Sequence, residues 1–133
     1  MSIWTHVAGI IRVDEGTGNF DNISDLKKLF VKDIWGEPKE GKCNMPCGSE
    51  ESLNYSIWEN PDKSSICKYT ISIFGDLRDF EEPELPEIKQ WWDDIIKKLE
   101  YVRQAIILIE CEETSEPIIY KYTTKDWMES EDE

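Results

Sequence analysis

The sequence predicts an α+β domain with a ferredoxin-like split βαβ fold, in the order β-α-β-β-α-β, with one extra C-terminal strand. Several segments alternate apolar and polar residues with the period of a half-buried strand, and two others repeat apolar residues with the period of a helix. With 133 residues, the chain is long enough for one domain with a packed core. We place this domain at 1–122 and expect a flexible acidic tail at 123–133.

The stretch 68–111 predicts the centre of the fold, as a strand, an acidic loop, a helix and a second strand. Residues 69–74 alternate as a half-buried strand does, and Gly75 ends it. Pro86 suits the first turn of a helix, and 105–109 is an apolar run that suits a buried strand. The helix carries one apolar stripe, which consists of Ile88, Trp91, Trp92, Ile95, Ile96 and Leu99.

The segment before this centre predicts one strand and one helix. Residues 3–13 alternate with apolar residues on both faces, so we expect a central strand. Gly9 within it indicates a close backbone approach or a bulge. A helix should begin near Asn22 or Ser24, either of which can cap a first turn, and end at Gly36. Its core-facing stripe would be Ile23, Leu26, Leu29, Phe30 and Ile34.

The remaining strands are predicted as two hairpins. Residues 53–58 should pair with 69–74 through the turn at 60–62, and 118–122 should pair with 105–109. The first and third strands would be central, with both helices on one face. The alternative is another α+β sandwich with the same elements connected differently. An exposed edge strand would also allow a homodimer by sheet extension.

The formal net charge of −14 limits the classes of partner. Residues 1–66 carry 11 acidic and 7 basic side chains, and residues 67–133 carry 18 and 8, so the second half is the more acidic. A field of this sign repels free nucleic acid and anionic membranes, and it favours either a basic partner or solubility alone. Since no secretory signal or spanning apolar run is visible, we expect a soluble, cytoplasmic protein.

Residue types that usually carry catalysis or bind metals are sparse. Cys43 and Cys47 form a CxxxC pair, which could supply two of the four ligands of a zinc site. Two further ligands are not evident in the sequence. Whether the two cysteines form a disulfide stays open. Cys67 and Cys111 lie at strand ends and are expected in the core. His6 is the only histidine, and no serine lies in a nucleophile elbow. We therefore predict a chain that is not an enzyme and uses no metal or cofactor.

Two acidic segments are the strongest candidates for a binding surface. The predicted partner-binding residues are Asp76, Asp79, Glu81, Glu82, Glu84, Glu110, Glu112, Glu113 and Glu116. Their spacing is not that of an EF-hand, and Glu84 and Glu87 also suit a helix start, where carboxylates stabilise the helix dipole. Two interpretations stay open: a solvated surface, or an acidic surface for a basic partner.

A second kind of function, binding of a small ligand such as a nucleotide signal, is the alternative. The loop 39–52 would fold over a sheet face, and Arg12, Lys42 or Arg78 would meet a phosphate. The negative field of the chain opposes this. No P-loop is present, because 16–19 is not followed by Lys-Ser/Thr, and the aromatic–basic signature of RNA-binding ferredoxin-like domains is missing.

Two short segments resemble small uncharacterised proteins of phages and prophages of Gram-positive bacteria. They are 45–50, which leads into a strand, and 74–79, which closes one. The resemblance implies an accessory protein made in the host bacterial cytoplasm during infection. Small acidic phage proteins include nucleic-acid mimics that block host defence nucleases, among them anti-CRISPR proteins. The resemblance therefore favours an inhibitor of a basic, nucleic-acid-binding host protein.

Overall fold

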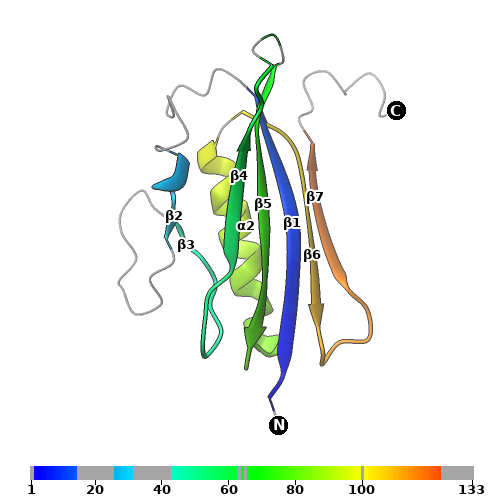
Figure 1. Ribbon diagram of the computed structural model, residues 1–133. Coiled ribbons are helices and arrows are strands. Elements are labelled where there is room, and N and C mark those ends of the chain that lie inside the picture. Colours follow the sequence, from blue (N-terminus) through cyan, green and yellow to red (C-terminus); the bar gives the residue numbers. More distant parts are fainter. Residues whose placement is uncertain are drawn as a thin grey trace, which may run out of the picture.

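The computed structural model describes residues 2–14, 26–31, 43–62, 64, 66–99 and 101–123. They form a five-stranded antiparallel sheet with a helix on one face (Figure 1). The strand order across the sheet is β4-β5-β1-β6-β7. The strands are β1 (Trp4–Asp14), β4 (Asn54–Glu59), β5 (Cys67–Arg78), β6 (Val102–Cys111) and β7 (Ile118–Thr123).

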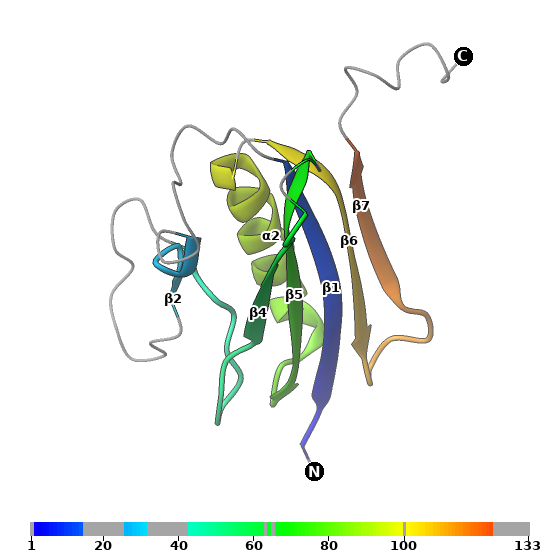
Figure 2. The ribbon, with the colours of Figure 1, turned by 45° about the horizontal axis from the view of Figure 1, so that its top comes forward.

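Helix α2 (Leu85–Leu99) follows a short 3-10 turn, η1 (Glu82–Glu84), and lies behind the sheet in Figure 1. Since β5 and β6 are both antiparallel to β1, they run in the same direction, and α2 makes the crossover between them. Two further strands, β2 (Phe30–Val31) and β3 (Cys43–Asn44), form a separate parallel pair beside the helix (Figure 2).

The predicted ferredoxin-like arrangement with two helices is wrong. The described residues contain a single α-helix against a five-stranded sheet. In the region of the first predicted helix, Leu26 and Lys27 are helical and 28–29 form a turn, in which the Leu29 N–H donates to the Leu26 carbonyl at 3.1 Å. Phe30 then begins β2. Apolar spacing of i, i+3 and i+4 fits one turn as well as a long helix, and aromatic and β-branched residues favour a strand. The other parts of that predicted helix lie outside the described residues.

Both predicted hairpins are confirmed, because β4 pairs with β5 and β6 pairs with β7. Strand β1 is central, as predicted, and pairs with β5 on one side and β6 on the other. The close approach predicted at Gly9 is also confirmed, because a Cβ there would lie 2.9 Å from the Ile106 carbonyl oxygen. A side chain at this position would push β1 away from β6.

The core lies between the sheet and α2. Alternate strand residues point into it, so that Val7, Ile11 and Val13 are buried while most of the residues between them are exposed. The predicted stripe of α2 is buried along the whole helix. Cys67 and Cys111 are buried, as predicted. Among the described residues, no element covers the other face of the sheet (Figures 1 and 2).

Candidate functional site

The two acidic segments meet at one end of the sheet, at the bottom of Figure 1. The ends of β5 and β6 lie on either side of the start of β1, because His6 is in register with both Asp76 and Glu110. The turn η1 follows β5 at this end, and the β6–β7 turn follows β6. We call this region the acidic end. It consists of the nine predicted residues Asp76, Asp79, Glu81, Glu82, Glu84, Glu110, Glu112, Glu113 and Glu116.

Hydrogen bonds from the backbone fix the acidic end to the sheet. The Glu82 N–H donates to a Glu113 carboxylate oxygen at 2.8 Å, which joins the two segments directly. Phe80, which lies between Asp79 and Glu81 in the chain, is buried. Its N–H donates to the Ile3 carbonyl at 3.2 Å, and its carbonyl accepts from the Thr5 hydroxyl at 2.6 Å. The acidic side chains are therefore carried by backbone that is anchored on β1.

Negative charge at the acidic end is only partly compensated. Among the described residues, His6 forms ion pairs with it, at Asp76 and Glu112, whereas the nearby Arg78 is paired with a residue outside it. The Arg78 guanidinium lies 3.0 Å from a Glu50 carboxylate oxygen and donates to the Ser2 hydroxyl at 2.9 Å. Burial and then the neighbouring Glu84 carboxylate raise the pKa of Glu87, because both disfavour its charged form.

His6 lies between carboxylates of both segments. Its Nδ1 is 2.7 Å from Asp76 Oδ1, and its Nε2 is 3.7 Å from Glu112 Oε2. The hydrogen bond with Asp76 raises the pKa of His6 from its ordinary value of 6.5, and partial burial acts in the opposite direction. The charges of Asp76 and Glu112 raise it further. The pKa of His6 therefore depends on the negative charge of the acidic end.

Asp76→Asn is expected to lower the pKa of His6 towards its ordinary value, because it removes both the charge and the strongest acceptor. Glu112→Gln is the matched control and should lower this pKa less, since Glu112 is farther away. Because the folded-state pKa is raised, His6 stabilises the fold fully below about pH 6.5, and this contribution is lost as the pH rises through the folded-state value. NMR titration of the imidazole protons measures the pKa; an unchanged value in Asp76→Asn contradicts the prediction.

The three residues predicted for the alternative ligand site do not come together. Arg12 is in register with Thr70, whereas Arg78 is in register with Trp4, so the two arginines are eight positions apart along β1. This separation corresponds to about 27 Å of strand. The Arg12 guanidinium donates to the Gln104 side chain at 3.1 Å. Lys42 lies outside the described residues.

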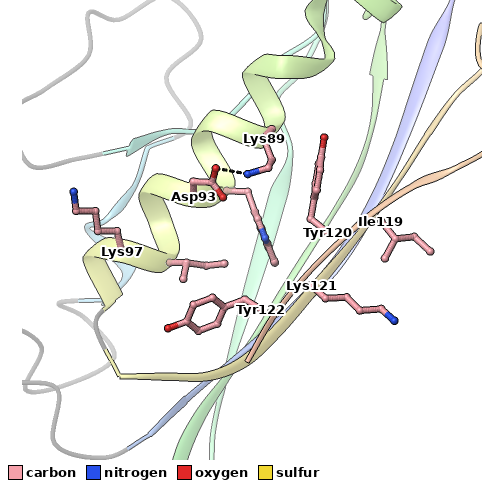
Figure 3. Close-up of a pocket in the computed structure, with 9 residues that line it drawn as sticks. Lys89, Asp93, Lys97, Ile119, Tyr120, Lys121 and Tyr122 are labelled. Carbon is pink, nitrogen blue, oxygen red and sulfur yellow. Dashed lines mark hydrogen bonds and ion pairs between the residues drawn. The ribbon is translucent and has the colours of Figure 1, made fainter. Parts of the chain in front are cut away.

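A pocket between α2 and β7, which sequence reasoning missed, has a volume of about 600 Å³ (Figure 3). Its lining includes Lys89 and Lys97 from α2 and Tyr120 and Tyr122 from β7. The Lys89 ammonium lies 5.1 Å from the centre of the Tyr120 ring and forms an ion pair with Asp93. Figure 3 shows both tyrosines on the helix side of β7. The alternation of β7 is visible in the sequence, but the pocket depends on β7 joining the sheet beside β6.

The cysteine pair that the sequence offered as a possible metal site does not form a second functional site within the described residues. Burial and then the nearby Glu87 carboxylate raise the pKa of the Cys47 thiol, which disfavours its thiolate. The side chain of Cys43 lies outside the described part of the structure. Within that part, no three His, Cys, Asp or Glu side chains are placed to hold a metal ion. No described helix is both long and apolar enough to cross a membrane.

Comparisons with known proteins leave the family of this chain open. No family model matches the sequence, and no curated protein matches it. In structure the chain is similar to a phage SAM lyase solved in complex with S-methyl-5′-thioadenosine, with a TM-score of 0.40 and 8% sequence identity. The alignment covers 91% of this chain and 92% of that chain. At such values the function has to be argued from the chain itself.

Proposed function

We propose that this chain is a non-enzymatic binding protein whose acidic end inhibits a basic, nucleic-acid-binding host protein. Its carboxylates would take the place of phosphates on the partner's basic surface. The negative field would raise the association rate by steering the two proteins together. The sequence resemblance to phage accessory proteins supplies the setting, a bacterial cytoplasm during infection.

The meeting of the two acidic segments is the observation that carries this proposal. Glu81 and Glu82 are exposed beside the β6–β7 turn, and the hydrogen bond from Glu82 to Glu113 fixes the spacing of the segments. A pre-arranged set of charges loses less conformational entropy on binding than one carried by a mobile loop. Trp4 lies half-buried at the same end of β1, where its ring offers apolar area beside the carboxylates.

Charge reversal at the exposed turn tests the proposal. The full chain is used to capture proteins from a Gram-positive bacterial lysate, and the captured protein is then purified for binding measurements at several salt concentrations. Glu81→Lys combined with Glu82→Lys is expected to weaken binding by about 10- to 100-fold at physiological salt, mainly through a slower association rate. The captured protein should bind either this chain or its nucleic acid, but not both.

A matched control reverses two charges elsewhere. Glu59→Lys with Asp94→Lys makes the same change in net charge on β4 and α2, away from the acidic end. This variant should change the affinity by less than about threefold. Equal losses in both variants would show that only the overall charge matters. Binding that survives the reversal at Glu81 and Glu82 would leave the acidic end as a solvated surface.

A second candidate function is binding of a small anionic ligand that carries an aromatic ring, such as a nucleotide. The observation that favours it is the pocket between α2 and β7, where two tyrosines can stack with a ring and Lys89 and Lys97 can meet a phosphate. The same capture experiment distinguishes the two functions. A nucleotide released by heating the purified chain, without any captured protein, would favour the pocket over the acidic end.

A further inference from the structure

The uncovered face of the sheet carries a continuous apolar patch. Strand register places Phe74, Ala8, Leu108 and Ile119 in one row across four strands, and Ile10 and Ile106 in the next row. These six residues are called the apolar patch. The side chains of Ile10, Phe74, Ile106 and Ile119 are each 44–49% exposed. An apolar area of this continuity on a sheet face indicates an interface.

Charged side chains of opposite sign lie at opposite ends of this face, along the direction of the strands. On one side of the apolar patch, Asp76 and Glu110 flank His6 in adjacent strands. On the other side, Arg12 occupies the middle of the row that includes Thr70 and Gln104. The face therefore carries carboxylates beyond one end of the apolar patch and cations at the other, where Lys121 is in register with Ile106 and Arg12 lies in the next row. Two copies of this face are therefore complementary in charge when the strands of one copy run opposite to those of the other.

The geometry points to a second copy of this chain as the occupant of the face. The two copies would form a two-fold symmetric dimer in which the sheets pack face to face. The two-fold axis would lie between the sheets, parallel to both and perpendicular to the strands. This axis lays Arg12 of each copy over His6 of the other, so that the guanidinium lies between Asp76 and Glu110 on the two neighbouring strands. An axis along the strands would instead oppose the like carboxylates. Electrostatics thus selects one of the two face-to-face arrangements.

The same arrangement matches the apolar rows by size. It lays the large side chain of Phe74 over the small Ser72, and Ile10 over Ala8. Leu108 faces Ile106 of the other copy, beside a cavity of about 370 Å³ that Ile10 and Ile106 help to line. Large side chains opposite small ones interdigitate in sheet-on-sheet packing.

The area of the face is sufficient for a stable dimer. Five strands of these lengths, about 4.8 Å apart, cover roughly 700 Å² of sheet. Each partner in a standard protein interface contributes about 800 Å². The exposed turn at Glu81 and Glu82 lies beyond this face, so the dimer would leave it free at both ends, and the inference does not depend on the proposed function.

Sedimentation equilibrium of the full chain over a range of concentrations tests the dimer. The unmodified chain should show the mass of two chains. Ile106→Glu is expected to raise the dissociation constant by about 100-fold, because it places a carboxylate within the apolar patch. Ile66→Glu is the matched control, since Ile66 is 61% exposed and lies before β5, off the patch. Circular dichroism verifies that both variants fold.

A charge exchange tests the direction of the axis. Arg12→Glu should weaken the dimer by about tenfold, and adding Asp76→Arg in the same chain should restore part of the loss. A monomer at all concentrations overturns the inference. A dimer that survives Ile106→Glu also overturns it and would indicate pairing through an edge strand. A failure of Asp76→Arg to restore the dimer overturns the proposed axis.

Discussion

Trp92→Ala is expected to lower the free energy of unfolding by about 3–5 kcal/mol. Trp92 is 1% exposed and is the largest of the fully buried side chains among the described residues. It lies on α2, the only described helix that covers the sheet, and its ring centre is 6.5 Å from that of Trp91. Removing the indole leaves a cavity between helix and sheet that neighbouring side chains can fill only in part.

Trp58→Ala is the matched control for this prediction. Trp58 lies on the outer strand β4 with its side chain 55% exposed. Its loss should change the free energy of unfolding by less than about 1 kcal/mol. Chemical denaturation followed by circular dichroism measures both variants at the same protein concentration. Similar effects of the two substitutions would contradict the assignment of Trp92 to the core.

Gly48→Ala is expected to destabilise the fold by about 1–3 kcal/mol and to release the segment that contacts Arg78. A Cβ at Gly48 would lie 2.5 Å from the Arg78 carbonyl oxygen and 2.6 Å from its nitrogen. Since both are backbone atoms of β5, the clash cannot be relieved by a side-chain rotation. The chain must therefore move away, and the hydrogen bond from the Ser49 N–H to the Arg78 carbonyl, 2.9 Å long, should break.

Amide hydrogen exchange distinguishes this local release from a general loss of stability. The Ser49 amide should exchange much faster in Gly48→Ala, while amides in the centre of β1 should change only as much as the overall stability does. Ser49→Ala is the control, because it removes the hydroxyl that donates to Asp79 at 2.8 Å but leaves the backbone unchanged. It should cost less than about 1 kcal/mol. Unchanged protection of the Ser49 amide in Gly48→Ala would contradict the predicted clash.

Local patterns predicted most of the elements. The alternation in β5 and the 3.6-residue period of α2 each mark one buried face, and both hairpins follow from adjacent strands with turn residues between them. The first predicted helix is wrong at Phe30 and Val31, which form β2, because the apolar positions Leu26, Leu29 and Phe30 fit the end of a helix followed by a strand equally well. Their burial was predicted correctly, because apolar residues are buried in either structure.

The sequence by itself determined which residues are acidic, which faces of the strands are apolar, and where α2 buries its stripe, because charge and periodicity are local properties. Only the tertiary structure decided that Asp76 and Glu110 flank the same residue of β1, that Arg12 and Arg78 lie far apart, and that β7 forms a pocket with α2. These relations depend on strand order and register. Long-range hydrogen bonds and core packing set both, and no short window of residues contains them.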